Sequence, residues 1–302
     1  MSITNVNQLT GDRLLLLDGA MGTQLINSGL APGESPESLN LSKPEVVEAV
    51  HTQYLQAGSD VILTNTFGGN RNRLALHGLE EQVEEINAAA VRVARKAALN
   101  FDAKIAGSIG PLGGLLAPLG SITPQEAHDA FSEQAGGLTS NPGPHAAADS
   151  IDLFWIETMS SLDEALLALQ ACQKISSIPA AVTMSFDTNR HTMMGVSPTQ
   201  AVETLVEAGA VAVGLNCGQS LEDNEAVISQ MAHAAKDVAL IAKPNAGIPQ
   251  WHDGDLHYSG TTTVMVDFFR RFADLGVKLI GGCCGTTPQH IAAMRQAWPK
   301  AN

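Results

Sequence analysis

The sequence has few positively charged residues. It carries 17 lysines and arginines against 31 aspartates and glutamates, which gives a formal net charge of −14 and a pI near 4.9. A surface of this sign repels the phosphate backbone of nucleic acids and the anionic headgroups of membranes. The composition therefore argues against nucleic-acid and membrane partners and leaves small molecules, but it says nothing about which ones.

Long hydrophobic runs and a secretory signal are also missing. No apolar stretch reaches the roughly 18 residues that a transmembrane helix needs. The N-terminal stretch Met1–Arg13 contains no basic segment followed by an apolar one. We therefore expect a cytoplasmic protein. A homo-oligomer is compatible with the sequence, although no segment demonstrates one.

Aromatic residues and cysteines are scarce. Aromatics make up 4% of the chain, and the four cysteines are Cys172, Cys217, Cys283 and Cys284. In a cytoplasmic protein, cysteines beside glycines more often bind metal or take part in catalysis than form disulfides. The adjacent pair at 283 and 284 is also poorly placed to form a disulfide with itself, because the bond would strain the peptide between them.

What the sequence does contain is a repeated pattern. Eight times, a short apolar run is followed by a turn rich in small and polar residues and then by a stretch rich in alanine, glutamate and leucine. Near-continuous apolar runs are typical of parallel strands that are buried on both faces. The predicted strands are Leu14–Leu17, Asp60–Leu63, Ala103–Ala106, Leu153–Ile156, Ala180–Met184, Ala210–Leu215, Val238–Ala242 and Val277–Ile280.

The stretches between these runs are predicted to be crossover helices. Ser197 followed by Pro198 has the pattern of a helix cap and a first-turn proline. Eight strand–helix units predict an α/β fold, a (β/α)8 TIM barrel that forms a single domain over residues 1–302. A doubly wound sheet would need no eighth unit. The predicted helices include Pro44–Ala57, Leu79–Leu99, Ser161–Ser176, Pro198–Ala208, Leu221–Ala235 and Thr261–Leu275.

One stretch interrupts this pattern. Gly136–Asp149 combines a glycine pair with Asn-Pro-Gly-Pro, a sequence that is expected to end a helix. We predict a loop before the fourth strand, and the sequence assigns no function to it.

Polar and glycine residues follow each predicted strand, which is where a barrel builds its active site. Asn216–Gly218 follows the sixth strand and Gly281–Gly285 follows the last one, so both segments would deliver cysteine to the same end of the barrel. Zinc prefers sulfur and nitrogen ligands in tetrahedral geometry, and a catalytic zinc keeps one position open. We therefore predict a Zn²⁺ site formed by Cys217, Cys283 and Cys284. Cys172, inside a predicted helix, is expected to be a buried apolar residue.

This set of ligands predicts the chemistry. Three thiolates give a zinc site of net charge −1, in which electron-rich sulfur weakens the Lewis acidity that water activation requires. Such a site is better suited to binding a substrate thiol, which loses its proton and stays nucleophilic at neutral pH. The cluster therefore favours alkyl transfer to a thiol. The alternative from another class is a zinc- or redox-sensing protein that does not turn over a substrate.

Seven segments together resemble one known family. They are LLLLDGAMGTQL (Leu14–Leu25), GSDVILTNTFGGNRNRLALHGL (Gly58–Leu79), GSIGPLG (Gly107–Gly113), WIET (Trp155–Thr158), GLNCG (Gly214–Gly218), KPNAG (Lys243–Gly247) and LIGGCCGTTPQHI (Leu279–Ile291). In this order they are similar to the homocysteine S-methyltransferases. That family includes the homocysteine domain of cobalamin-dependent methionine synthase, betaine–homocysteine methyltransferase and enzymes that use S-methylmethionine. The resemblance implies a zinc-dependent barrel enzyme that methylates homocysteine to methionine.

The resemblance also implies roles for individual residues. Cys217, Cys283 and Cys284 match the zinc ligands at the catalytic centre. Asp18 and Glu157 match acidic residues that receive the amino group of homocysteine, because a carboxylate accepts charge-assisted hydrogen bonds from an ammonium. The remaining substrate-binding candidates are Gly19, Ala20, Thr66 and Ser108, for the substrate carboxylate, and Asn245, which resembles a residue that approaches zinc when substrate is absent.

The methyl donor is left open between two classes. Thr183–Val202 resembles bacterial proteins described as betaine–homocysteine methyltransferases, which favours a small onium donor, betaine first. A trimethylammonium group is expected to contact aromatic faces. However, Gly33–Asn40 corresponds to the tryptophan-bearing loop of the animal betaine enzyme and has no aromatic residue. Gly68 likewise stands where that enzyme has a tyrosine, which leaves Phe67, Phe186, Trp251 and Tyr258 as candidates.

Other donors are compatible with the same barrel. S-methylmethionine and dimethylsulfoniopropionate are further onium compounds. The second class is methylcobalamin carried by a partner protein, which would make this chain the homocysteine-binding subunit of a split methionine synthase.

Overall fold

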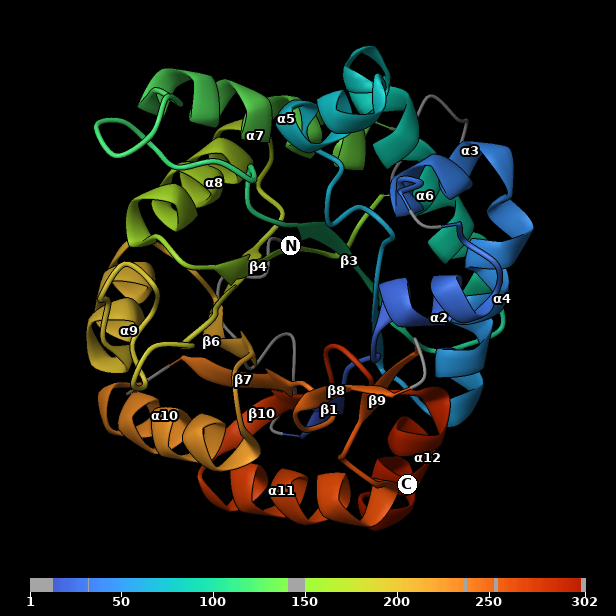
Figure 1. The fold of residues 1–302 in the computed structure, drawn as a ribbon, viewed down its shortest axis with the longest axis vertical. Helices are drawn as coiled ribbons and strands as arrows, with labels where there is room; N and C mark the ends of the chain where they lie inside the picture. The colour runs from blue at the N-terminus through green and yellow to red at the C-terminus, as the bar shows by residue number, and fades with distance from the viewer. Residues whose placement is uncertain (1–12, 32, 141–149, 236–237, 253–254, 300–302) are drawn as a thin grey trace.

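The computed structural model describes residues 13–31, 33–140, 150–235, 238–252 and 255–299, with the backbone alone for 249–252 and 255–257. Eight parallel strands form one sheet in the order β1-β10-β7-β6-β5-β4-β3-β2. A further bridge between Leu17 and Val61 joins β1 to β2, so the sheet curls into a nearly closed barrel (Figure 1). These strands are β1 (Leu15–Leu16), β2 (Val61–Leu63), β3 (Lys104–Ile109), β4 (Leu153–Met159), β5 (Ala180–Met184), β6 (Ala212–Cys217), β7 (Ala239–Pro244) and β10 (Val277–Ile280).

The predicted TIM barrel is confirmed, and each of the eight predicted strands overlaps an observed one. A doubly wound sheet would keep two free edges, whereas here the last strand pairs with the first in parallel, Leu15 opposite Leu279. The helices form an outer ring around the strands (Figure 1). They are α2 (Met21–Asn27), α3 (Leu39–Ser42), α4 (Pro44–Ala57), α5 (Arg71–Leu74), α6 (Val83–Ala97), α7 (Pro124–Thr139), α8 (Leu162–Ile175), α9 (Pro198–Glu207), α10 (Leu221–Ala234), α11 (Thr262–Asp274) and α12 (Pro288–Ala297), with short 3-10 turns η1 (Pro36–Ser38), η2 (Ala75–His77) and η3 (Glu80–Gln82).

Several helices begin at the residues that the sequence marks as caps. The hydroxyl of Ser197 accepts a hydrogen bond from the amide of Gln200, 3.2 Å away, and Pro198 occupies the first turn as predicted. Ser161, Ser220 and Thr261 cap α8, α10 and α11 in the same way. Such caps satisfy amides that have no partner inside the helix, and each stabilises its helix by about 1 kcal/mol.

The prediction of a helix stop at Gly136 is wrong. Helix α7 continues through the glycine pair to Thr139. A Cβ at Gly137 would lie 2.9 Å from the Cβ of Asn87 and 3.0 Å from the Cα of Glu84, so the missing side chain lets α7 pack closely on α6. The second part of that predicted loop, residues 141–149, lies outside the described residues.

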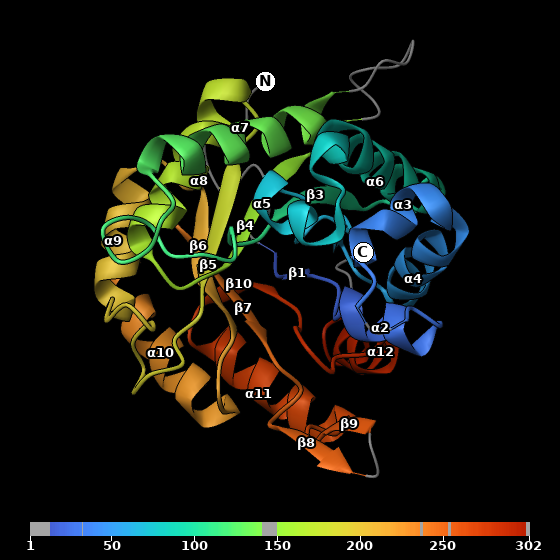
Figure 2. The same cartoon turned by 45° about the horizontal axis from the view of Figure 1, so that its top comes forward.

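The structure also contains a hairpin that the sequence pattern did not predict. Strands β8 (Pro249–His252) and β9 (Asp255–Tyr258) pair antiparallel between β7 and α11. The hairpin projects from the same end of the barrel at which the strands finish (Figure 2). Its strands are too short for an alternating pattern to be recognised.

The interior of the barrel determines which residues face the active end. The inward-facing apolar residues form a separate cluster that includes Leu153, Trp155, Ala239 and Ile241. Because successive side chains of a strand alternate between faces, the next inward positions towards the carboxyl ends carry the polar residues. These positions are Ser108 on β3, Glu157 on β4, Asn216 on β6 and Lys243 on β7.

Among the described residues, none of the helices is long and apolar enough to cross a membrane.

A buried histidine on α4 gives the fold a sensitivity to acid. His51 is fully buried, neither ring nitrogen has a hydrogen-bond partner among the described residues, and burial lowers its pKa to about 4. The folded state therefore favours the neutral ring. The stability that this provides is complete above the unfolded pKa, near 6.5, and is lost as the pH falls from there towards 4.

When the pH is lowered from 7.5 to 4.5, we expect His51 to decrease the unfolding free energy of the protein by about 2 kcal/mol. Urea denaturation at both values should show a larger loss for the wild type than for His51→Leu. The exposed His77→Leu should behave like the wild type. Equal losses in all three proteins would contradict the assignment.

Candidate metal and substrate site

Three cysteine sulfurs come together at the carboxyl ends of the strands. Cys217 ends β6, and Cys283 and Cys284 follow β10. The three Sγ atoms lie within 4.8 Å of one another, and those of Cys217 and Cys283 are 3.1 Å apart. Cys217 has a φ of 61°, in the left-handed region that non-glycine residues rarely adopt. Three converging thiols are a donor set that fits a metal ion such as Zn²⁺.

Asn216 holds two of these sulfurs in place. It is fully buried, and its Nδ2 atom lies 3.4 Å from Sγ of Cys217 and 3.9 Å from Sγ of Cys283. Its Oδ1 atom accepts hydrogen bonds from the amide of Thr158 and the hydroxyl of Thr183, at 2.8 and 2.7 Å. The sequence analysis gave this residue no role. Its position directly before Cys217, at an inward-facing place on β6, is the signal that could have identified it.

Asn245 supports the loop that carries Cys284. Its Oδ1 atom accepts a hydrogen bond from the amide of Cys284 at 3.1 Å, and its Nδ2 atom donates to the carbonyl of Gly218 at 3.1 Å. The side chain thus links the two cysteine-bearing segments and is not among the residues that line the adjoining cavity. The predicted approach of Asn245 to a metal stays a prediction.

The pKa values of the three thiols differ from one another. Hydrogen bonds, the largest from Cys217 and then Cys283, lower the pKa of Cys284 to about 3. Hydrogen bonds with Cys283 and Cys284 raise the pKa of Cys217 well above its usual range. Tyr258, at the end of the hairpin, also contributes a hydrogen bond to Cys284. The cluster therefore stabilises a thiolate at neutral pH. Cys172, by contrast, is buried in α8 as predicted.

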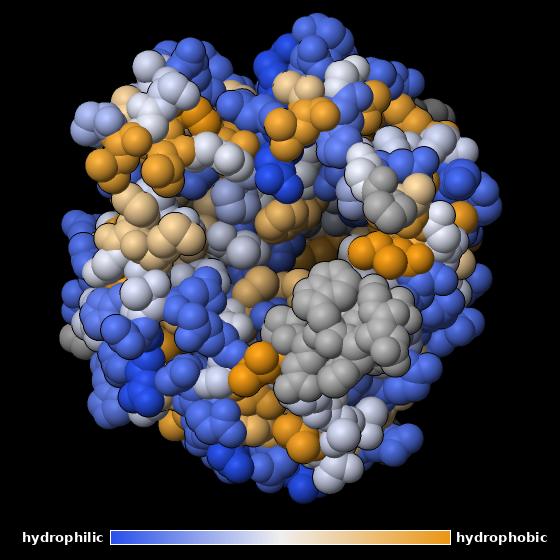
Figure 3. Space-filling view, in the orientation of Figure 1, coloured by the Kyte–Doolittle hydropathy of each residue, from blue (hydrophilic) through white to orange (hydrophobic). Residues whose placement is uncertain are grey.

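A cavity of about 400 Å³ adjoins the sulfurs. It lies within the range of about 300–1,000 Å³ that small-molecule sites occupy. The cavity opens in the hollow near the middle of the face shown in Figure 3. Besides the three cysteines, its lining contains the charged residues Asp18, Glu37, Glu157 and Lys243.

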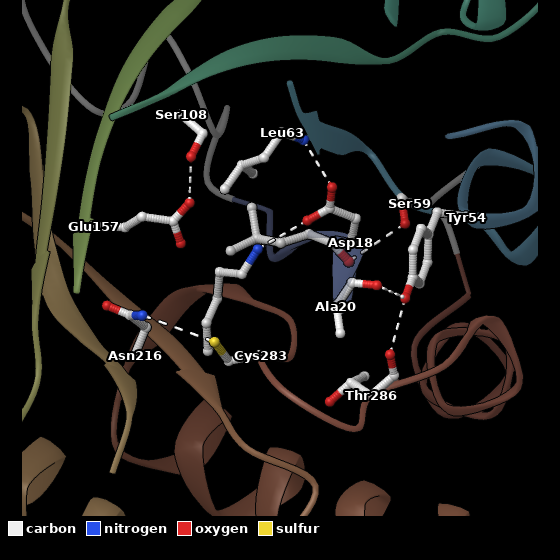
Figure 4. Close-up of polar contacts among 12 residues, drawn as sticks. Asp18, Ala20, Tyr54, Ser59, Leu63, Ser108, Glu157, Asn216, Cys283 and Thr286 are labelled. Carbon is white, nitrogen blue, oxygen red and sulfur yellow. Dashed lines mark hydrogen bonds and ion pairs between the residues drawn. The ribbon is translucent and has the colours of Figure 1, made fainter. Parts of the chain in front are cut away.

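Asp18 is already paired with a lysine. Its Oδ1 atom accepts from Nζ of Lys243 at 2.8 Å, and its Oδ2 atom accepts from the amide of Leu63 at 2.7 Å (Figure 4). The two charged side chains are 3% and 4% exposed, and Nζ lies 5.9 Å from the ring centre of Trp155. Burial lowers the pKa of Lys243, but Asp18 and Glu157 outweigh it, so the net shift is upward and the amine stays charged.

Lys243 changes what was expected of Asp18. The family resemblance predicts that Asp18 receives a substrate ammonium, and the motif KPNAG by itself gives Lys243 no role. The structure places an ammonium of the protein itself against that carboxylate. Lys243 therefore has a role in the site that the sequence pattern did not predict. Its inward-facing position, two residues beyond Ile241, is the feature that could have indicated this role.

Glu157 offers a carboxylate oxygen that is not yet used. The hydroxyl of Ser108 donates to Oε1 at 2.5 Å, as Figure 4 shows, and no bond to Oε2 occurs among the described residues. Burial is the main cause that raises the pKa of Glu157 to about 7, and Lys243 acts against it. The direction follows from burial, which disfavours the charged form of a carboxyl group.

The groups expected to hold a substrate carboxylate are bonded within the protein. The amide of Ala20 donates to the carbonyl of Thr286 at 3.1 Å. The hydroxyl of Thr66 donates to the carbonyl of Ser108 at 2.7 Å, and that of Ser108 donates to Glu157. All of them, together with Gly19, line the cavity. Their role in substrate binding stays a prediction.

The aromatic candidates lie in different environments. Phe186 is 3% exposed and belongs to the core, whereas Phe67 is 37% exposed and lines the cavity. The side chain of Trp251 lies outside the described residues.

Residues 15–298 match the family model described as homocysteine S-methyltransferase. The chain belongs to the homocysteine S-methyltransferase family. It is therefore a member of a family of methyltransferase enzymes, as the sequence analysis predicted. A sensor without turnover does not agree with this membership.

The chain is similar in sequence to two methionine synthases. The chain is 29% identical to the methionine synthase of Mycobacterium leprae and 28% identical to that of Mycobacterium tuberculosis, over 99% and 97% of its own length. It spans only 25% of the length of these relatives.

Solved structures show the same fold. The metallated form of the homocysteine methyltransferase MmuM from Escherichia coli has a TM-score of 0.79 and 24% identity, with 97% of this chain and 99% of that chain covered. The carboxyl transferase domain of Rhizobium etli pyruvate carboxylase gives a TM-score of 0.54 at 12% identity, covering 99% of this chain and 49% of that one. At these identities, the likeness establishes the barrel architecture alone.

Proposed function

We propose that the protein transfers a methyl group from a small onium donor, betaine first, to the thiol of L-homocysteine, giving methionine. The observation that carries the proposal is the convergence of Cys217, Cys283 and Cys284 on a cavity that also contains a carboxylate with an unused oxygen, that of Glu157. The family membership supports the same acceptor. The proposal places the whole function in one domain over residues 1–302, acting on small molecules in the cytoplasm.

We assign zinc to the three cysteines. A thiolate-rich zinc would supply a site at which a substrate sulfur loses its proton and stays nucleophilic at neutral pH. Asn216 keeps two of the sulfurs in position through its amide. Asp18 and Lys243 are almost completely buried, so the interaction between their charges is screened less than it would be at the surface.

Glu157 would bind the ammonium group of homocysteine. Its Oε2 atom is unused, its other oxygen is fixed by Ser108, and it lines the same cavity as the cysteines. Asp18 would contribute to this negative environment while Lys243 neutralises it in part. The residues together would align the substrate sulfur with the methyl carbon, and such alignment is a large part of the catalysis of a bimolecular reaction.

The raised pKa of Glu157 predicts how homocysteine binding depends on pH. Only the carboxylate form attracts an ammonium, and the pKa of about 7 means that protonation begins near neutrality. As the pH falls below 7, the KM for homocysteine should therefore rise by about tenfold per unit. Steady-state kinetics between pH 5.5 and 8.5 would measure this slope.

Glu157→Gln should bind homocysteine weakly and without this dependence on pH. Glu164→Gln is the matched control, because Glu164 is also a buried glutamate but does not line the cavity, and it should keep the wild-type profile. A wild-type KM that is flat across the range would contradict the role of Glu157.

A panel of methyl donors tests the proposed function directly. Zinc-loaded protein and homocysteine are incubated with betaine, S-methylmethionine, dimethylsulfoniopropionate or methylcobalamin, and methionine is quantified. We expect product with at least one onium donor, betaine first. Failure of all four would overturn the proposed reaction.

A second candidate function rests on the similarity to two methionine synthases. These two methionine synthases are about four times as long as the chain, which spans 25% of each. The barrel would then be the homocysteine-binding part of a cobalamin-dependent methionine synthase, and methylcobalamin would supply the methyl group. Activity with methylcobalamin alone would favour this candidate over the onium enzyme.

A further inference from the structure

A third carboxylate in the cavity, besides those of Asp18 and Glu157, has no role in the proposed binding of homocysteine. Glu37 lies in the 3-10 turn η1 between β1 and α4, is 7% exposed, and lines the cavity together with Phe67. Its loop, Gly33–Asn40, has no aromatic residue that could contact a trimethylammonium group. The loop nevertheless brings a buried charged group to the cavity.

Hydrogen bonds fix this carboxylate in one orientation. Oε1 accepts from the amide of Gly68 at 2.7 Å, and Oε2 accepts from the hydroxyl of Ser35 at 2.7 Å. A Cβ at position 68 would lie 2.9 Å from Oε1, so glycine at this position lets the carboxylate approach the backbone. Glu37 is therefore held beside the segment that follows β2.

The loop itself is attached to that segment. The side-chain Nδ2 of Asn65 donates to the carbonyl of Pro36 at 2.7 Å, and the side-chain Nδ2 of Asn40 donates to the carbonyl of Asn65 at 2.8 Å. Both asparagines are buried. The position of Glu37 thus belongs to the fixed architecture of the site.

The cavity contains more negative charge than homocysteine can neutralise. No lysine, arginine or histidine pairs with Glu37 in the described part of the chain. Glu37, Asp18 and Glu157 line the cavity against the single ammonium of Lys243. Homocysteine bound as its thiolate has one ammonium, one carboxylate and one thiolate, so it brings no net positive charge. A buried carboxylate without a cation is costly, which favours a second ligand that carries a positive charge.

Glu37 also lies on the side of the cavity opposite Cys217. In the barrel order, β2 is separated from β6 by four steps in either direction, through β3, β4 and β5 or through β1, β10 and β7. Gly68 and Phe67 follow β2, whereas Cys217 ends β6. Cys283 and Cys284 follow β10, which is two strands from β2. An in-line displacement places the leaving group on the far side of the methyl carbon from the attacking sulfur, and Glu37 and Phe67 lie across the barrel from Cys217, one of the three sulfurs proposed to hold the metal.

We propose that Glu37 and the ring of Phe67 form the subsite for the positively charged group of the methyl donor. This inference rests on the proposed function. The carboxylate supplies the opposite charge, and the aromatic ring supplies a face that attracts an ammonium or sulfonium. The donor class is therefore cationic, a quaternary ammonium or a sulfonium compound.

The charge changes of the reaction determine which kinetic parameter Glu37 affects. The electron pair of the homocysteine thiolate forms the new sulfur–carbon bond. The carbon–nitrogen or carbon–sulfur bond of the donor breaks, and its electron pair stays on the leaving atom. The donor therefore loses its positive charge in the transition state. A fixed carboxylate beside it stabilises the bound donor more than the transition state, so Glu37 lowers the KM for the donor without raising kcat.

The test is the kinetics of Glu37→Gln with betaine and with S-methylmethionine. Glutamine keeps an oxygen that accepts from the amide of Gly68 and removes the charge, and its Nε2 can donate to the hydroxyl of Ser35, which donates to Glu37 in the wild type. We expect the KM for whichever donor the wild type uses to rise by about tenfold, with kcat not lowered and the KM for homocysteine little changed. The matched control is Glu34→Gln, on the same loop, because Glu34 is exposed and does not line the cavity.

Betaine and a neutral isostere separate the effect of the donor's charge from the effect of its shape. Inhibition by 3,3-dimethylbutyrate, in which carbon replaces the nitrogen of betaine, should be unchanged or stronger in Glu37→Gln, because this compound has no positive charge. Phe67→Leu should weaken the binding of the cationic donor by about two- to fivefold. Both variants are compared with the wild type by circular dichroism and thermal melting, so that a folding defect is recognised.

Two outcomes overturn the inference and leave the proposed function standing. One is a Glu37→Gln enzyme that forms methionine with an unchanged donor KM. The other is an equal loss of affinity for betaine and for the neutral isostere. If no donor supports methionine formation in the wild type, the proposed function itself fails, and direct calorimetric binding of betaine to the zinc-loaded protein still tests the subsite.

Discussion

Replacing Cys217 with alanine should remove the bound metal and lower methyl transfer to homocysteine by at least about a thousandfold, which corresponds to about 4 kcal/mol of transition-state stabilisation. The three sulfurs lie within 4.8 Å of one another, so each is a direct candidate ligand. A site with two thiolates binds zinc far more weakly than a site with three, because each ligand contributes directly to the binding free energy. Without the metal, a homocysteine thiol with an ordinary pKa near 8.5 is mostly protonated at neutral pH.

The measurement combines metal analysis with kinetics. The purified wild type should contain about one zinc per chain by mass spectrometry of the metal, and Cys217→Ala should contain almost none. Cys172→Ala is the matched control, since Cys172 is a buried cysteine in α8 and is not one of the three sulfurs that converge. It should keep both metal and activity. Methyl transfer by protein from which zinc has been stripped would refute the zinc mechanism.

The same cluster shows how far the sequence alone leads. The apolar runs predict all eight barrel strands, and the strand ends predict that Cys217 and Cys283 meet although they are 66 positions apart. Both predictions follow from local pattern and from one rule of barrel geometry, that strand ends share a face. In the structure the three sulfurs lie close together, in agreement with that reasoning.

Other features depend on contacts between distant segments. The ion pair between Asp18 and Lys243 spans 225 positions, and nothing near either residue in the sequence indicates the other. Glu37 enters the cavity because two asparagines attach its loop to the segment after β2. The glycine pair in α7 looks like a helix stop, yet it serves close packing against α6. In each case a tertiary contact decides what the local pattern leaves undetermined.

The pair formed by Asp18 and Lys243 is also the second place where a single substitution should have a large effect. Both side chains are at most 4% exposed, and Nζ and Oδ1 are 2.8 Å apart. In Lys243→Met the packing of the aliphatic stem is largely kept, but Asp18 is left as a buried carboxylate without a cation. Breaking a buried pair in this way costs about 3–5 kcal/mol of unfolding free energy.

A double-mutant cycle measures this coupling. In the double variant, Asp18→Asn with Lys243→Met, neither charge is left, so we expect it to be more stable than Lys243→Met alone by about 2 kcal/mol or more. Urea denaturation of the two single variants, the double variant and the wild type supplies the four values. Arg271→Met is the matched control, because its ion pairs with Glu225 and Asp267 are partly exposed and its loss should cost about 1 kcal/mol or less. Additive effects of the two substitutions would show that the pair is not coupled. A strong coupling would establish that Lys243, and not only a substrate ammonium, keeps Asp18 ionised on the floor of the cavity.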